Sequence, residues 1–214
     1  MTAQCLGRTS ARSTRNIRTT LGWLGLMFAF ASTTIAQKPA PILLHLDPST
    51  TQIHWTLNTN LHIVHGTFRL KSNDVKVDPA SGDATGLIVI DATSGESGES
   101  ARDRRMHSAI LESARYPTIS FRPTHVEGKI DLVTGGPIAV TGAFSLHGQD
   151  HPLQIIIHMQ PQKPGSQPST NALTTHFSIP FVAWGLKDPS TFIFRTDKEV
   201  ALDIDAIAIF AATN

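Results

Sequence analysis

The sequence predicts an all-β domain of about eight antiparallel strands with one short helix. From Gln52 onward, apolar and polar residues alternate with a period of two, and clusters of Gly, Pro, Asp and Ser interrupt the alternation. This pattern is typical of antiparallel strands that bury one face. Such strands build either a sandwich or a closed barrel, and the periodicity does not choose between them. An eight-stranded barrel encloses a space just wide enough for side chains or for one small ligand.

The first two predicted strands show the clearest alternation. Ile53, Trp55 and Leu57 share one face, and Phe68 and Leu70 share one face of the next strand. Further strands are predicted at Leu87–Asp91, Thr118–Glu127, Lys129–Val133, Ile138–Leu146, Leu153–Met159, Leu173–Ile179 and Val200–Ile209. Loops rich in Gly, Ser and Pro are predicted at Ser94–Ser100 and Pro161–Asn171. Neither loop is long enough to separate two domains, so residues 37–214 are predicted to form one domain.

One segment, Ser100–Ser113, departs from the strand pattern and is predicted to be a short helix. Ser100 offers a helix cap, with Asp103 three residues later, and apolar residues follow at helical spacing. Pro117 ends the segment, because the residue before a proline is pushed toward extended conformations. Arg102 and Asp103 could grip the head group of a ligand. Capping of the helix start by Asp103 and local pairing of Arg102 explain the two residues better.

The first 36 residues are predicted to be a cleaved signal peptide. Four arginines precede an apolar run from Leu21 to Ala31, and no acidic residue lies in the segment. The run is shorter than the roughly 20 apolar residues that a membrane-spanning helix needs. The stretch Thr34-Ile35-Ala36 resembles a cleavage site. The mature chain is therefore expected to comprise residues 37–214 and to be exported, either to the periplasm or to the cell exterior.

The composition of residues 37–214 excludes several kinds of site. Cys5 is the only cysteine and precedes the apolar run, so the mature chain would have no disulfide, no cysteine metal site and no cysteine nucleophile. Without the four arginines of the leader, the 18 basic residues fall to 14 against 17 acidic residues, a formal net charge of −3. A nucleic-acid partner is therefore not expected.

Apolar stripes on the predicted strands are the main candidates for a binding site. They could line a ligand cavity, or they could fill a closed core. An apolar ligand in such a cavity would gain about 0.8 kcal/mol for each buried methylene. The candidate ligand-binding residues on the strands are Trp55, Leu57, Phe68, Phe121, Phe144, Leu146, Ile155, Ile157, Phe177, Leu202 and Ile204.

Two further groups of apolar residues are expected at the ends of the fold. On the predicted helix, Met106 and Leu111 could contact a ligand or could pack there without touching it, and a flexible methionine suits an adaptable contact. In the loop before the last strand, Phe181 and Trp184 are further candidates for ligand binding. The Trp184 ring, beside Gly185, could close over an apolar ligand or could simply plug the end of the fold.

No metal site and no catalytic site are predicted. His62 and His65 lie three residues apart, which puts their rings on opposite faces of a strand, and His147 and His151 flank a predicted turn. The chain contains no Gly-x-Ser-x-Gly elbow, no His-Glu-x-x-His element and no phosphate-binding glycine loop. We therefore expect a protein that is not an enzyme and that requires no cofactor.

Four segments of the chain, taken together in their order and spacing, identify a protein family more specifically than any one of them does alone. They are Ile53–Leu57 followed by Gly66–Phe68, Arg102–Phe121 with Tyr116-Pro117 near its end, Val140–Leu153, and Phe181–Leu186 with Trp184-Gly185-Leu186. In this order and spacing, the chain resembles the YceI-like family of exported polyisoprenoid-binding proteins over nearly its whole mature length. It departs from the family pattern at Thr59, where a histidine is usual, and in the shorter connection from Asn58 to Gly66.

The resemblance implies a lipocalin-like, closed antiparallel barrel whose lumen takes an isoprenoid chain, often that of an isoprenoid quinone. The implied function is lipid binding for transport, storage or sequestration, without an enzymatic step. A transient membrane contact and a homodimer are compatible with this function. The alternative is a non-enzymatic extracytoplasmic interaction module with a fully packed barrel, which would act through its loops. A lipid hydrolase or isomerase would need a polar cluster in the lumen, and the predicted stripes offer none.

Overall fold

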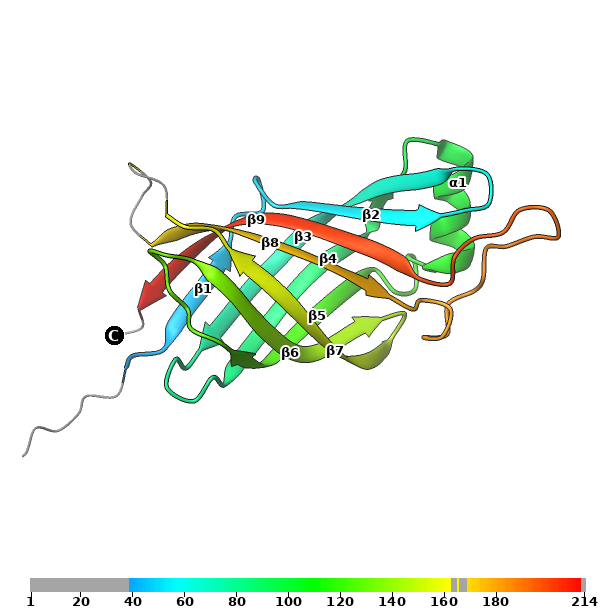
Figure 1. Ribbon diagram of the computed structural model, residues 1–214. Coiled ribbons are helices and arrows are strands. Elements are labelled where there is room, and N and C mark those ends of the chain that lie inside the picture. The colour runs from blue at the N-terminus through cyan, green and yellow to red at the C-terminus, as the bar shows by residue number, and fades with distance from the viewer. Residues whose placement is uncertain (1–38, 163–164, 166–168, 213–214) are drawn as a thin grey trace, which may run out of the picture. The chain divides into compact units, whose positions relative to one another are not determined.

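Nine antiparallel strands in the described part of the chain form one sheet that closes into a barrel (Figure 1). The structure is a computed structural model, and it describes residues 39–162, 165 and 169–212. The predicted signal peptide lies outside these residues. The strands are β1 (Ile42–Leu46), β2 (Gln52–Asn58), β3 (Ile63–Val77), β4 (Ala84–Glu96), β5 (Thr118–Glu127), β6 (Gly136–Leu146), β7 (Gln149–Met159), β8 (Thr170–Ile179) and β9 (Val200–Ala212). The closed antiparallel barrel predicted from the sequence is confirmed.

The ring has eight strand positions because β1 and β2 occupy one of them in succession. In β2, Trp55 lies opposite Gly66 of β3 and Leu202 of β9. In β1, Leu43 lies opposite Ala211, farther along β9, and β1 also pairs with the end of β3. The pairing of β3 with β4 completes the ring. The two ends of the barrel are therefore built differently, with β2 at one end and β1 at the other.

The end that carries β2 is called the mouth here, and it comprises the β2–β3 turn, the helical segment after β4, and the connection between β8 and β9, residues 180–199 (Figure 1). The opposite end, which carries β1, is called the closed end. Two buried amides bind main-chain atoms there. The Asn73 side chain accepts from the Leu46 N–H at 2.5 Å and donates to the Leu46 carbonyl at 2.8 Å. The Asn171 amide donates to the carbonyls of Leu132 and Gln160.

Two glycines on the strands make room for aromatic rings on the neighbouring strand. A Cβ atom at Gly66 would lie 2.3 Å from the ring of Trp55, and one at Gly142 would lie 2.7 Å from the ring of Phe121. Both distances are too short for a side chain, so each ring lies directly over the backbone of its neighbour. Both glycines belong to segments that carry the family resemblance, and the close approach explains why glycine is needed there.

The helical segment is shorter than the sequence predicts, and a different residue caps its N-terminus. It consists of α1 (Ser100–Arg105) followed by a π-helical turn, η1 (Met106–Ile110). Glu99, and not Ser100, caps it, because the longer carboxylate accepts from the N–H groups of two residues in the first turn, at 3.0 and 2.7 Å. The Asp103 carboxylate turns outward and accepts from the Ser97 N–H at 2.9 Å. No helix in the described residues is long and apolar enough to span a membrane.

Three other local predictions need correction. Residues 129–133 lie in the connection between β5 and β6, and residues 132–134 form a turn, because the Asp131 carboxylate accepts from the N–H groups of Val133 and Thr134 at 3.0 and 3.1 Å. The same bonds hold the pKa of Asp131 below its usual value, and a side chain that binds its own backbone competes with a strand ladder. The loop predicted from Ser94 is strand as far as Glu96. Of the loop predicted at 161–171, the last two residues belong to β8, and 163–164 and 166–168 lie outside the described residues.

Candidate ligand-binding cavity

A cavity of about 620 Å³ runs inside the barrel. It lies within the size range of small-molecule sites, about 300 to 1,000 Å³. Every strand contributes inward-facing apolar side chains to it, and η1 contributes Met106 and Ile110. The interior is therefore not filled by side chains, so the fully packed barrel considered as an alternative does not describe this structure.

Fourteen of the fifteen ligand-binding candidates chosen from the sequence line this cavity. They come from seven strands, the helical segment and the connection after β8, so the closure of the barrel brings together residues far apart in the chain. Those that line the cavity are Trp55, Leu57, Phe68, Met106, Leu111, Phe121, Phe144, Leu146, Ile155, Ile157, Phe177, Phe181, Leu202 and Ile204. Contact of these residues with a ligand remains a prediction.

Trp184 is the candidate that does not line the cavity. Its ring stacks on His151, with centroids 4.2 Å apart and the planes parallel, and it lies 5.7 Å from the ring of Phe144. In the same turn, Phe181 is 5% exposed and lines the cavity. The turn therefore directs Phe181, and not Trp184, into the barrel. Trp184 therefore packs against Phe144 and His151, and contact of its ring with a ligand stays a prediction.

Several lining residues were not singled out from the sequence. Most lie on strands. Those on β3 and on β5 to β9 share the buried face of residues that were, so the same alternation could have found them: Val64, Leu70, Ile119, Val140, Leu153, Met159, Leu173 and Phe210. Leu44 on β1, and Ile88 and Ile90 on β4, lie on strands that held no candidate. Pro189 and Phe194 come from the long connection before β9. No periodic signal marks these two, because a loop has no regular face.

The polarity of the lining changes along the barrel. The ionisable side chains that line the cavity are His62, Arg102 and Arg105, and all three lie at the mouth. Thr59 and Thr196 line the same region and form an isolated bridge that ties the β2–β3 turn to the connection before β9. Toward the closed end the lining is almost wholly apolar, with residues such as Leu46, Val77, Val126, Met159 and Phe210. The cavity is thus apolar along its length and polar at its mouth.

The polar groups at the mouth are held in place by neighbours. The Arg102 guanidinium donates to the Ser97 hydroxyl at 2.7 Å and to the Ser97 carbonyl at 3.1 Å. The Arg105 guanidinium donates to the Pro189 carbonyl at 3.0 Å. Deeper in the barrel, the Trp55 indole N–H is buried and has no hydrogen-bond partner among the described residues. Buried donors usually have a partner, so Trp55 is a candidate donor to an oxygen of a bound molecule.

The lining residues contain no serine, cysteine, tyrosine or carboxylate. Within the described ranges, no group of three or more His, Cys, Asp or Glu side chains is arranged to hold a metal ion. The half-buried His107 makes local contacts, since its ring nitrogens bond the Ser113 hydroxyl at 2.9 Å and the Gly95 carbonyl at 2.8 Å. The arrangement of the cavity suits shelter of an apolar chain with a polar group at one end.

Comparisons with known proteins agree with this fold. Among solved structures, the chain is similar to BcnA of Burkholderia cenocepacia, with 15% identity, a TM-score of 0.59, and coverage of 76% of this chain and 98% of that one. It is also similar to a polyisoprenoid binding domain from Saccharophagus degradans implicated in plant cell wall breakdown, with 16% identity, a TM-score of 0.55, and coverage of 79% and 98%. A third similar structure is a YceI protein of Campylobacter jejuni, with 17% identity, a TM-score of 0.52, and coverage of 71% of this chain and 85% of that one.

At these identities the solved structures show a shared fold, and no curated protein matches the chain significantly. The family model of the YceI-like domain matches residues 44–208, from within β1 to within β9. The match therefore spans every strand of the closed barrel and the helical segment at its mouth. The chain belongs to the YceI-like family.

Proposed function

We propose that the protein is an exported, non-enzymatic lipid-binding protein that holds one isoprenoid chain in its lumen, for transport, storage or sequestration. The ligand class is a polyisoprenoid or an isoprenoid quinone. The observation that carries this proposal is the cavity of about 620 Å³, which is mostly apolar along its length and has ionisable lining side chains only at the mouth. The similarity to a domain named for polyisoprenoid binding supports the same ligand class.

The two ends of the cavity give the ligand a direction. An isoprenoid chain would lie toward the closed end, among residues such as Val126 and Phe210, and would gain about 0.8 kcal/mol for each methylene removed from water. Its head group would stay at the mouth, where Arg102 and Arg105 can donate to oxygen atoms. The lumen supplies no acid, base or nucleophile deep enough to meet the chain. Binding alone is therefore the function that the geometry supports best.

The predicted signal peptide supports the same proposal. Four arginines ahead of a short apolar run precede the barrel domain. A protein outside the cytoplasm that carries a water-insoluble lipid needs an interior of this kind, because an isoprenoid chain has no stable place in the aqueous phase.

Native mass spectrometry of the purified protein, with solvent extraction of the same sample, tests the proposal. We expect a stoichiometric adduct whose extracted mass identifies an isoprenoid lipid. A protein that carries no adduct, and that stays bare after incubation with isoprenoid quinones and polyprenols, would contradict it. The Ile155→Glu variant should lose the lipid adduct, because it places a carboxylate in the apolar lining. The outward-facing neighbour Gln154→Glu serves as its control.

A further inference from the structure

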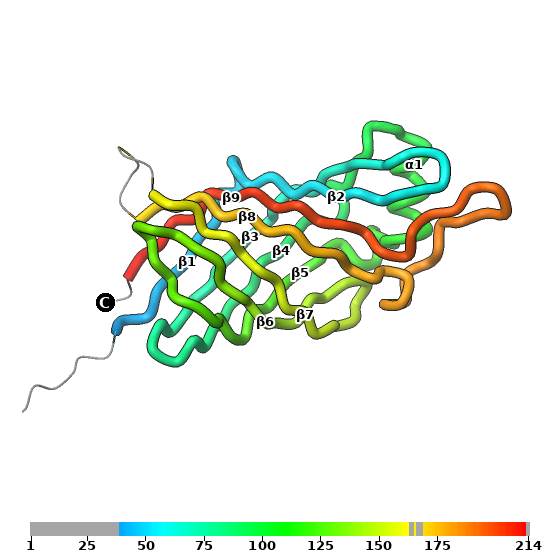
Figure 2. The backbone as a smooth tube through the Cα atoms, in the orientation of Figure 1, coloured from blue at the N-terminus to red at the C-terminus, as the bar shows by residue number. Residues whose placement is uncertain are grey.

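The mouth carries a small group of large apolar side chains that point into solvent. Phe192 is 96% exposed and Ile193 is 77% exposed, both in the connection before β9. Leu61, in the neighbouring β2–β3 turn, is 67% exposed. The ribbon and the tube both show this connection projecting past the barrel beside that turn (Figures 1 and 2). These three residues are called the apolar tip, and exposed apolar groups of this size mark an interaction site.

Hydrogen bonds join the two segments that carry the apolar tip. The Asn60 N–H donates to the Arg195 carbonyl at 3.0 Å, and the Asn60 side chain accepts from the Arg195 N–H at 2.9 Å and donates to the Ile193 carbonyl at 3.1 Å. Thr191 closes the turn, since its hydroxyl accepts from the Phe194 N–H at 3.0 Å. The tip is therefore held in position by polar contacts rather than by burial of its own side chains.

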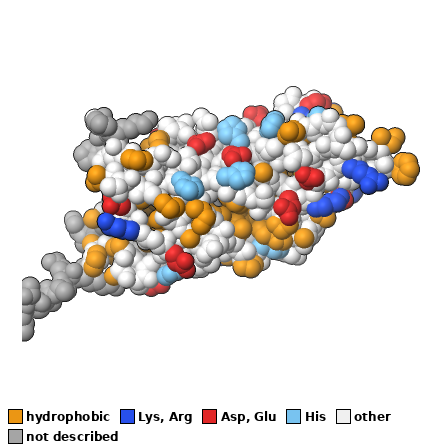
Figure 3. All heavy atoms as spheres, in the orientation of Figure 1, with side chains coloured by type: hydrophobic (Ala, Val, Ile, Leu, Met, Phe, Trp, Pro, Cys, Tyr) orange, Lys and Arg blue, Asp and Glu red, His pale blue; other side chains and the backbone are white. Residues whose placement is uncertain are grey.

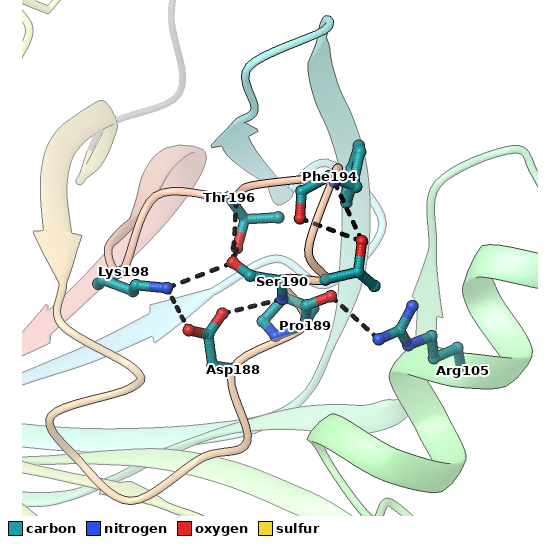
Figure 4. A network of polar contacts seen from close by, with 8 residues as sticks. Arg105, Asp188, Pro189, Ser190, Phe194, Thr196 and Lys198 are labelled. Carbon is teal, nitrogen blue, oxygen red and sulfur yellow. Dashed lines mark hydrogen bonds and ion pairs between the residues drawn. The ribbon is translucent and has the colours of Figure 1, made fainter.

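The base of the same connection is held by contacts within it and by one contact with α1 (Figure 4). The Asp188 carboxylate accepts from the Ser190 N–H at 2.9 Å and from the Lys198 ammonium. The Ser190 hydroxyl lies 3.1 Å from that of Thr196, and the Arg105 guanidinium of α1 reaches the Pro189 carbonyl. Each contact fixes the connection without covering Phe192 or Ile193.

Near the apolar tip, some basic side chains are free to bind a partner, whereas most acidic side chains are already hydrogen-bonded. The side chains of Lys187 and Arg195 have no partner among the described residues. The Asp188 carboxylate bonds Lys198 within the connection, and the Asp197 carboxylate accepts from the Asn58 amide of β2. The remaining carboxylate of the connection, Glu199, precedes β9 at its base. Figure 3 shows hydrophobic side chains at the extremity of the molecule with basic side chains next to them. Cations behind an apolar tip complement an anionic lipid surface.

The apolar tip is continuous with the mouth of the cavity. Phe194, the residue after Ile193, lines the cavity and lies 6.1 Å from the ring of His62, which lines it as well. The three side chains of the protruding apolar tip are far too few for a stable protein interface, which buries about 800 Å² on each partner. They are enough to enter the interfacial region of a bilayer, where each buried apolar group adds to binding.

We propose that the apolar tip docks the protein on an anionic phospholipid bilayer, with the mouth of the barrel toward the membrane. This proposal rests on the proposed function, since it gives the route by which an isoprenoid chain passes between bilayer and lumen. Leu61, Phe192 and Ile193 enter the interface, and Lys187 and Arg195 face the anionic head groups. The chain then enters along Phe194 without crossing water.

Co-sedimentation with vesicles of phosphatidylcholine, with and without phosphatidylglycerol, tests the docking. The double variant Phe192→Ser/Ile193→Ser should bind vesicles at least about tenfold more weakly, because two large apolar side chains no longer leave water. Arg195→Gln should weaken binding about fivefold, and only to vesicles that contain phosphatidylglycerol. Val133→Ser is the matched control, because Val133 is 70% exposed but lies in the β5–β6 turn at the closed end. It should bind as the wild type does.

A Phe192→Trp variant reports insertion directly, since its emission should shift to the blue on addition of the anionic vesicles. Equal vesicle binding by the wild type and the double variant would overturn the proposal. A wild type that binds neither kind of vesicle would overturn it too, and would leave a protein partner as the occupant of the tip. Native mass spectrometry separates this failure from that of the proposed function. Phe192 and Ile193 do not line the cavity, so the double variant should keep its lipid adduct and its unfolding midpoint.

Discussion

Replacing Ala206 by Phe should shorten the lipid chain that the lumen accepts. Ala206 lies on β9 opposite Leu173, lines the cavity toward the closed end, and is 6% exposed. The added phenyl ring takes the space of about six chain carbons, so a chain that reaches this depth would lose about 5 kcal/mol at about 0.8 kcal/mol per methylene. A chain about one isoprene unit shorter, five carbons, avoids most of that loss. The variant should therefore select a shorter lipid.

Native mass spectrometry of lipid-loaded protein from one host measures this change as the mass of the adduct. Ala201→Phe is the matched control, because Ala201 lies on the same strand but its side chain points to the other face of the sheet, away from the cavity. The control should carry the same lipid as the wild type. An Ala206→Phe protein that is folded and carries a lipid of unchanged length would refute the placement of the chain end at the closed end.

Three other predictions concern stability. Phe144→Ala should lower the free energy of unfolding by about 3 to 5 kcal/mol, because the ring is 4% exposed; a urea midpoint close to that of the wild type would contradict its place in the core. Asn73→Ala should cost about 2 to 4 kcal/mol in the same assay, because it leaves the buried N–H and carbonyl of Leu46 without partners; a neutral effect would show that water replaces the amide. Hydrogen bonds, first from the Lys198 ammonium and then from the Ser190 hydroxyl and N–H, lower the pKa of Asp188 from 3.8 to about 2. This pairing therefore stabilises the connection before β9 above about pH 4 and is lost as the pH falls toward 2. Lys198→Met should raise the pKa of Asp188 in an NMR titration, and an unchanged value would rule out the pairing.

Strand alternation predicted most of the cavity lining correctly. A side chain on a strand points to one of two faces, so the buried face of β6 or β9 can be read from every second residue. Phe144 and Leu146, or Leu202 and Ile204, were assigned in this way, and they line one cavity. Alternation says nothing about turns, and so it did not distinguish Phe181 from Trp184. It also missed β1, a short strand whose apolar run has no clean period of two.

The sequence by itself determined the fold class, the inward faces of the strands and the family, because these depend on local periodicity and on short motifs. Only the tertiary structure decided that the interior is hollow, since a cavity depends on how eight strand positions close and on how large the inward side chains are together. It also decided which residues meet at the mouth. Asn60 and Arg195 are joined by hydrogen bonds although 135 positions separate them in the chain. Contacts of that kind follow from the closure of β2 against β9, which no local pattern encodes.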